Sequence, residues 1–271
     1  MTNAAHPSRR AVLAAATLAA LQTNSAVAQP SADINVRSVG SGPTTWVLLH
    51  PFSASGRFWE ARAAALATQH NVRILLPDLP SHGRSRIVQR FDYNAATDAI
   101  ERALAVHRDS VALVVGASSG GIVGLKLASR LQRPVAAIGA GYSFTAENIA
   151  GMRELVRVPD PGTEQFVDAF LEQGEAQRAA LHRHFGDLAD FGTGPLFGAD
   201  ELAALASRTL IINGSRDDFF LPPAAHALAD AIPRSTLTFA TGAGHLEPLA
   251  PPYRDFTWAS VAAFLATRTT S

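Results

Sequence analysis

The chain has 271 residues, and its 23 basic and 23 acidic side chains leave a formal net charge of zero. This balance, without long runs of one charge, gives no reason to expect nucleic acid or an anionic membrane surface as a partner. Cysteine is absent, which excludes disulfides, thiolate nucleophiles and cysteine-ligated zinc. We therefore expect a globular protein with one large domain, or a core domain with a small insertion.

The N-terminus has the three parts of an export signal. The pair Arg9 and Arg10 precedes an apolar run over 11–21, and an Ala-x-Ala site follows at 26–28. The run is shorter than the roughly 20 residues that cross a bilayer, as in a cleaved signal peptide, and no later stretch could form a membrane span. The arginine pair resembles a twin-arginine signal; the alternative is an ordinary secretory signal. We predict a signal peptide over 1–28 and a periplasmic or secreted mature protein.

Strand and helix patterns alternate along much of the remaining chain. Apolar or alternating runs predict strands over 33–37, 46–50, 72–77, 111–115, 135–138, 209–213 and 235–240. Helical periodicity separates most of them, over 58–69, 93–107, 121–130 and 222–231, with a last helix over 253–267. Because such alternation forms right-handed βαβ crossovers, we expect an α/β fold with a mostly parallel sheet that is covered on both faces.

The alternation stops over 143–207, where the pattern is one of amphipathic helices, such as 146–156 and 163–174. The aromatic residues of this segment have no strand pattern of their own to cover. We interpret 143–207 as a small helical cap, inserted after the sixth strand of the sheet. The core is then made of two parts, 29–142 and 208–271.

The first candidate for chemistry is the segment Gly116-Ala-Ser-Ser-Gly120, where a buried strand breaks into a helix. In such a tight turn, side chains two residues on either side of Ser118 would collide, and both positions are glycine. The pattern predicts a nucleophile elbow, which presents a serine in a strained conformation at the top of the sheet. A second register would make Ser119 the nucleophile, with Ala117 where glycine fits better.

A nucleophilic serine needs a base within hydrogen-bond reach and an acid that orients this base. Two later strands end in Gly214-Ser-Arg-Asp217 and in Thr241-Gly-Ala-Gly-His245. The carboxyl ends of parallel strands meet at one edge, so these groups can converge with Ser118 in the chain order Ser, Asp, His. Asp218 is the alternative acid, because the end of a strand can differ by one residue.

These motifs together resemble those of the α/β-hydrolase superfamily, in particular its short-capped esterase, lactonase and perhydrolase-like branch. The resemblance covers 36–267 and implies the α/β-hydrolase fold. It also implies an oxyanion hole formed by the N–H groups of Phe52 and Ser119, with His50 and His82 as residues that organise loops. The motifs that carry it are Leu48-Leu-His-Pro-Phe-Ser53, Pro77-Asp-Leu-Pro-Ser-His-Gly-Arg-Ser85, Gly116-Ala-Ser-Ser-Gly-Gly121, Leu210-Ile-Ile-Asn-Gly-Ser-Arg-Asp217 and Gly242-Ala-Gly-His245.

Pro51 departs from the family pattern, in which a glycine precedes the residue of the oxyanion hole. Proline has no N–H, but the donor that the hole needs is the N–H of Phe52, which is kept. The loop that carries Phe52 is therefore expected to function, although with a different shape.

The resemblance implies a serine hydrolase without a cofactor or metal, acting on a small to medium, partly apolar carboxylic ester or lactone. The alternatives are a carbon–carbon lyase or hydrolase, a perhydrolase, and a non-catalytic ligand-binding relative. Nothing in the sequence specifies an oligomeric state. Residues expected to border the substrate are Tyr142, Phe144, Phe166, Phe170, Phe219 and Leu246.

Overall fold

The structure is a computed structural model that describes residues 33–206 and 208–267, so the predicted signal peptide over 1–28 lies outside the described residues. The strands of this part are β1 (Val36–Val39), β2 (Thr44–Leu49), β3 (Val72–Pro77), β4 (Val111–Ala117), β5 (Val135–Ile138), β6 (Thr209–Gly214) and β7 (Thr236–Ala240). They form one sheet in the order β1-β3-β2-β4-β5-β6-β7. Among these strands, β1 pairs with β3 antiparallel and all other pairs are parallel. The predicted mostly parallel sheet is confirmed.

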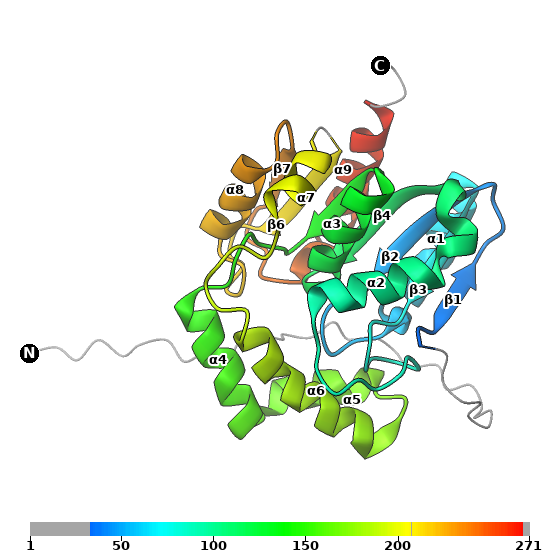
Figure 1. The fold of residues 1–271 in the computed structure, drawn as a ribbon. Helices are drawn as coiled ribbons and strands as arrows, with labels where there is room; N and C mark the ends of the chain where they lie inside the picture. The colour runs from blue at the N-terminus through cyan, green and yellow to red at the C-terminus, as the bar shows by residue number, and fades with distance from the viewer. Residues whose placement is uncertain (1–32, 207, 268–271) are drawn as a thin grey trace, which may run out of the picture.

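Helices lie on both faces of the sheet, and a further group of helices lies beyond the carboxyl ends of its parallel strands (Figure 1). They are α1 (Glu60–His70), α2 (Tyr93–Ala103), α3 (Ser119–Leu131), α4 (Ala146–Arg157), α5 (Pro161–Phe170), α6 (Gly174–Ala189), α7 (Ala199–Ala204), α8 (Pro222–Ala231) and α9 (Arg254–Ala266). Three short 3-10 helices accompany them: η1 (Gly56–Trp59), η2 (Ala105–Ser110) and η3 (Glu247–Leu249).

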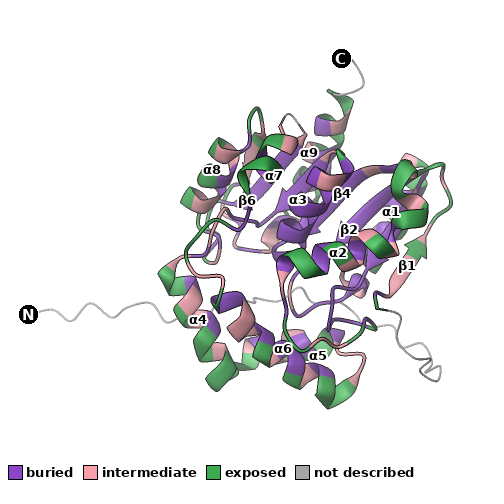
Figure 2. Cartoon of the chain, viewed as in Figure 1, coloured by how far each residue is buried: buried purple, intermediate pink, exposed green. Residues whose placement is uncertain are grey.

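The sheet has an apolar core on each face, because successive residues of a strand point to opposite faces. In β2, Val47 and Leu49 pack into a core with residues of α2, α3 and α8. Trp46 and Leu48 of the same strand pack instead with residues of α1 and α9. The central strands are buried nearly throughout, as Figure 2 shows, which explains why their sequences are continuous apolar runs.

Several boundaries differ from those predicted: the first strand is Val36–Val39 rather than 33–37, for example, and α5 ends at Phe170 rather than at 174. The helix after the elbow begins at Ser119 rather than Gly121, because the chain enters helical geometry directly after Ser118. The helix predicted over 93–107 ends at Ala103, where Leu104 leaves helical geometry, and the chain continues as η2.

The helices α4, α5 and α6 lie together beyond the sheet edge at which β2, β3 and β6 end (Figure 1). They contact the loops that follow these strands: Phe185 of α6 packs on Phe52, and Asn148 of α4 donates to the Phe219 carbonyl at 3.0 Å. This insertion follows β5, the fifth strand of the described residues, whereas we predicted it after the sixth strand. The five strands β1 to β5 match the five strands predicted before residue 143, so only the number given to the insertion point was wrong.

The chain returns to the core through α7, which packs against α3. Lys126 of α3 is buried, and its Nζ lies 2.9 Å from Glu201 Oε2 of α7. The outgoing and returning segments form a short stem, in which Ser143 bridges Pro195. Within the described ranges, no helix combines the length and the apolar character that crossing a membrane requires.

Candidate active site

Ser118 lies at the turn from β4 into α3, with backbone angles of φ 52° and ψ −121°. This conformation is sparsely populated for a residue with a side chain and costs on the order of 1–3 kcal/mol. A Cβ atom on Gly116 would lie 2.1 Å from the Gly120 carbonyl oxygen, and one on Gly120 would lie 2.4 Å from that of His50. The Ser118 N–H also donates to the Ile138 carbonyl at 2.8 Å. Close packing on both sides therefore holds the strained turn and requires both glycines.

The structure brings Ser118, His245 and Asp217 into one hydrogen-bonded series. His245 Nε2 lies 2.9 Å from Ser118 Oγ, and its Nδ1 lies 2.9 Å from Asp217 Oδ2. All three are largely withdrawn from solvent, with exposed fractions of 8%, 9% and 1% for Ser118, His245 and Asp217. With a carboxylate accepting the Nδ1 proton, neutral His245 presents the lone pair of Nε2 to the serine hydroxyl.

The loop after β6 fixes the orientation of Asp217. Its Oδ1 accepts hydrogen bonds from the N–H groups of Phe219 at 2.9 Å and Phe220 at 2.8 Å. These donors leave Oδ2 directed at His245. Asp218 has an exposed side chain, so the structure gives the contact with the imidazole to Asp217 rather than Asp218.

Ser119, the alternative nucleophile, has a different partner. Its Oγ lies 3.0 Å from the Tyr93 hydroxyl, and both side chains are buried. Burial raises the pKa of Tyr93, so this hydroxyl stays neutral. The imidazole of His245 is hydrogen-bonded to Ser118 and not to Ser119.

Gly139 is a residue of the site that sequence reasoning missed. It adopts φ 58°, and a Cβ atom there would lie 2.9 Å from the His245 carbonyl oxygen and 3.3 Å from the imidazole ring. The absence of a side chain at the end of β5 thus makes room for His245. The signal in the sequence was a glycine directly after the strand over 135–138.

The N–H groups of Phe52 and Ser119 are available as hydrogen-bond donors. The tight approach of Gly120 to His50 joins the start of α3 to the loop that carries Phe52. Among the described residues, neither N–H has a hydrogen-bond acceptor. Pro51 uses its carbonyl to accept from the N–H of Ala54 at 3.2 Å, so the proline shapes this loop without taking the donor away.

The two histidines expected to organise loops do so. His50 Nδ1 donates to the Pro51 carbonyl at 2.8 Å, and its Nε2 accepts from the Leu79 N–H at 2.9 Å. His82 Nδ1 lies 2.8 Å from the Pro80 carbonyl. Burial lowers the pKa of His50 to about 4 and holds the pKa of His82 well below its usual range. Both rings are therefore neutral at neutral pH.

We expect His50 to make the fold sensitive to acid. Its pKa is lower in the folded chain, so below pH 6.5 the unfolded chain binds a proton that the folded chain resists until about pH 4. The free energy of unfolding should fall as the pH is lowered through this window, by roughly 2–3 kcal/mol at pH 4.5 from His50 alone. Denaturant titrations at pH 7 and pH 4.5 should show a smaller loss in His50→Gln than in the wild type. Equal losses in both proteins would contradict this assignment.

The aromatic residues expected around the substrate divide into two groups. Phe219 lies beside the imidazole, with its ring centroid 5.2 Å from that of His245, and Phe144 stacks at 5.7 Å on Phe220 behind it. Tyr142 packs at the margin of the same core.

Phe166, Phe170 and Leu246 pack elsewhere. Phe170 lies 5.2 Å from Phe166 and 6.1 Å from Phe58, because η1 covers the apolar side of α5. Leu246 follows His245 but packs into the core on the α1–α9 face. Phe185 was absent from the predicted group, although its ring lies 5.0 Å from Phe52.

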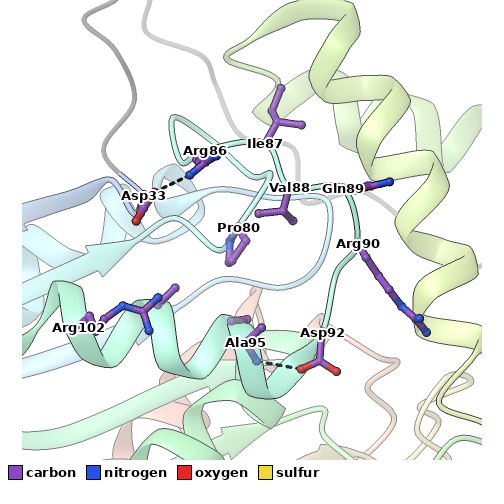
Figure 3. Close-up of a pocket in the computed structure, with 12 residues that line it drawn as sticks. Asp33, Pro80, Arg86, Ile87, Val88, Gln89, Arg90, Asp92, Ala95 and Arg102 are labelled. Atoms are coloured by element: carbon purple, nitrogen blue, oxygen red, sulfur yellow. Dashed lines mark hydrogen bonds and ion pairs between the residues drawn. The ribbon is translucent and has the colours of Figure 1, made fainter.

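A surface cavity of about 370 Å³ lies between α2 and the loop over 78–92 (Figure 3). Its lining includes Arg86, Arg90 and Arg102 and none of the predicted site residues. We therefore place the candidate chemistry at Ser118 and not in this cavity. In the part of the chain that the structure describes, no three His, Asp or Glu side chains are grouped to hold a metal ion.

Comparisons with known proteins identify the family of the chain. The alpha/beta hydrolase family model matches residues 46–259. The chain is 29% identical to the pimeloyl-[acyl-carrier protein] methyl ester esterase of Chromobacterium violaceum over 228 residues, which are 74% of this chain and 87% of that protein.

Solved structures share the fold at low sequence identity. The meta-cleavage product hydrolase of Pseudomonas fluorescens IP01 aligns with a TM-score of 0.67 at 20% identity, over 86% of this chain and 94% of that chain. The enol-lactonase of Burkholderia xenovorans LB400 aligns with a TM-score of 0.66 at 18% identity, over 86% and 96%. With a family match that spans most of the chain and the α/β architecture in place, this protein belongs to the alpha/beta hydrolase family.

Proposed function

We propose that this protein is a serine hydrolase that cleaves a carboxylic ester or lactone through an acyl-enzyme on Ser118. The observation that carries the proposal is the unbroken series from Ser118 Oγ to His245 Nε2 and from His245 Nδ1 to Asp217 Oδ2, both at 2.9 Å. A serine hydroxyl is a weak nucleophile unless a base accepts its proton during attack. Here the base is within hydrogen-bond reach and is itself held by a carboxylate.

In the first half of the reaction, Ser118 Oγ attacks the carbonyl carbon of the substrate and its proton passes to His245 Nε2. The carbonyl oxygen becomes an oxyanion, which accepts hydrogen bonds from the N–H groups of Phe52 and Ser119. The bond to the leaving oxygen then breaks, and that oxygen takes the proton from Nε2 and departs as an alcohol. Asp217 stays ionised and stabilises the imidazolium that exists between these two proton transfers.

Water completes the cycle by the same route in reverse. His245 Nε2 removes a proton from a water molecule, and the resulting hydroxyl group attacks the acyl carbon. The second oxyanion uses the same two N–H donors, after which the acid leaves and Ser118 recovers its proton. With a lactone, the alcohol and the acid are parts of one product.

The surroundings of the site favour a substrate that is partly apolar. The ring of Phe219 lies beside the imidazole of His245, and Phe185 of α6 packs on the ring of Phe52, whose N–H the proposal uses. A methyl ester is what the name of the Chromobacterium violaceum relative describes, which supports an ester as the substrate class.

Two measurements test the proposal. A fluorophosphonate probe should label the purified protein on Ser118, as mass spectrometry of the labelled peptide would report. A panel of p-nitrophenyl esters and lactones of different acyl length and ring size should show turnover that the same probe inhibits. No labelling together with no turnover would contradict the proposal. Cleavage of a dienone or hydroxynitrile without turnover of any ester would indicate carbon–carbon chemistry instead.

A further inference from the structure

Three residues near the end of α6 contact the surroundings of Phe52. Phe185 packs its ring 5.0 Å from the ring of Phe52 itself. His184 Nε2 lies 2.9 Å from Ser81 Oγ, and Asp187 Oδ2 accepts from the Phe91 N–H at 2.8 Å. The last two contacts reach the loop over 78–92, which connects β3 to α2.

The polar contacts form one continuous series in which every group has a partner. Asp187 Oδ2 lies 2.6 Å from His184 Nδ1, which therefore carries the proton. Nε2 of the same ring then accepts from the Ser81 hydroxyl, whose oxygen accepts from the Val88 N–H at 2.9 Å. Burial lowers the pKa of His184, which is consistent with a neutral ring.

The charge of Asp187 is partly balanced from the same loop. Arg90 points from the loop towards α6 (Figure 3), with its Nε 3.8 Å from Asp187 Oδ1. Ser81 is fully buried and adopts φ 66°. A strained and buried serine with two hydrogen bonds sets the path of the loop at this point.

The loop over 78–92 in turn supports Phe52. The ring of Phe52 contacts His82 edge-on at 4.8 Å and Phe91 at 5.6 Å, and both residues belong to the loop. Phe52 is thus enclosed by two residues of the loop and by Phe185 of α6. Because its neighbours on each side are held by α6, a shift of this helix would be transmitted to Phe52.

We propose that His184 and Asp187, together with the ring of Phe185, are positioning residues that hold the N–H of Phe52 at the oxyanion. This inference rests on the proposed function, in which that N–H stabilises the transition state. Such a donor must lie within 2.7–3.1 Å of the oxyanion, so small displacements reduce the rate. The α6 helix is then part of the catalytic framework.

The rival reading is that these contacts only attach α6 to the core. Other residues serve that purpose well: Gln177 Nε2 donates to the carbonyls of Ser81 at 3.1 Å and Gly83 at 2.9 Å. Glu172 accepts two hydrogen bonds of 2.7 Å from Arg37. Replacing a residue that serves only for attachment would change the stability of the protein or its binding of substrate, and would not selectively change the contact with the oxyanion.

His184→Gln tests the proposal, with His182→Gln as its matched control. His182 lies on the same helix, but its Nε2 lies 2.7 Å from Glu164 Oε1, within the cap helices and away from the loop over 78–92. We expect kcat for a p-nitrophenyl ester to fall about 10- to 100-fold in His184→Gln, while KM changes less than about threefold. This fall in kcat is smaller than the 10²- to 10³-fold fall that the complete loss of an oxyanion-hole donor causes. The inhibition constant of a trifluoromethyl ketone, whose adduct places an oxyanion in the hole, should rise by a similar factor. His182→Gln should stay within about twofold of the wild type.

Phe185→Leu is the second variant, because it removes the ring contact with Phe52 and keeps an apolar side chain and every hydrogen bond of His184 and Asp187. It should lower kcat and weaken the ketone adduct in the same direction even if His184→Gln does not fold. If His184→Gln folds and matches His182→Gln in kcat and in the inhibition constant, or if the folded variants change KM alone, the positioning role is overturned while the proposed function stands. A wild type without Ser118-dependent turnover would overturn both.

Discussion

Ser118→Ala is expected to lower kcat for ester hydrolysis by a factor on the order of 10⁶, leaving the residual rate that binding and the oxyanion hole supply. The alanine removes the Oγ that forms the acyl bond in the proposed reaction, together with the proton that His245 would accept. Labelling by a fluorophosphonate should disappear at the same time. The unfolding temperature should change little, since the strained backbone of residue 118 is held by its neighbours.

Ser119→Ala is the matched control for this experiment. The Oγ of Ser119 contacts the Tyr93 hydroxyl, and the N–H that the proposal uses is retained in the variant. We expect a loss within about tenfold, from the unpaired buried hydroxyl of Tyr93, and undiminished labelling of Ser118. Labelling that survives in Ser118→Ala and disappears in Ser119→Ala would make Ser119 the nucleophile and overturn the assignment.

Asp217→Asn is expected to lower kcat by about 10⁴ with little change in shape. The carboxamide oxygen can still accept from the N–H groups of Phe219 and Phe220, which hold Asp217 Oδ1 in the wild type. Its NH₂ group would then face His245 Nδ1 and would favour the tautomer with the proton on Nε2. Since that nitrogen must accept the serine proton, the imidazole is kept in the wrong form for catalysis.

Asp218→Asn provides the control, because the two carboxylates are adjacent in the chain and differ in exposure. We expect it to change kcat by less than about threefold, as for other exposed positions. Steady-state kinetics of both variants on one p-nitrophenyl ester are sufficient. A large loss in Asp218→Asn with a small one in Asp217→Asn would show that the other carboxylate orients the imidazole.

Several features of the site follow from local sequence because their physical cause is local. Glycines on both sides of Ser118 predict a tight turn, and the structure shows that a Cβ atom at either position would overlap a backbone carbonyl. The ends of β6 and β7 predict that Asp217 and His245 reach one edge of the sheet, and they do, because parallel strands place their carboxyl ends together.

Other features depended on contacts between segments distant in the sequence. Phe166 and Phe170 are apolar residues of the insertion, as expected for a pocket, but Phe170 packs against Phe58 and Phe166 packs against Phe170. Helical periodicity shows which side of α5 is apolar and does not show what covers it. The choice between Asp217 and Asp218 was of the same kind: it depended on which carboxylate meets the two N–H donors after β6.

The sequence by itself determined the parallel sheet, the elbow at Ser118 and the strand ends that supply Asp217 and His245, since periodicity and glycine spacing encode these directly. The tertiary structure alone decided how α6 is attached around Phe52. The series from Asp187 through His184 to Ser81 joins residues about a hundred positions apart, and isolated polar residues carry no periodic signal of their partners. Such contacts exist only once the insertion has packed on the core and has withdrawn these groups from water.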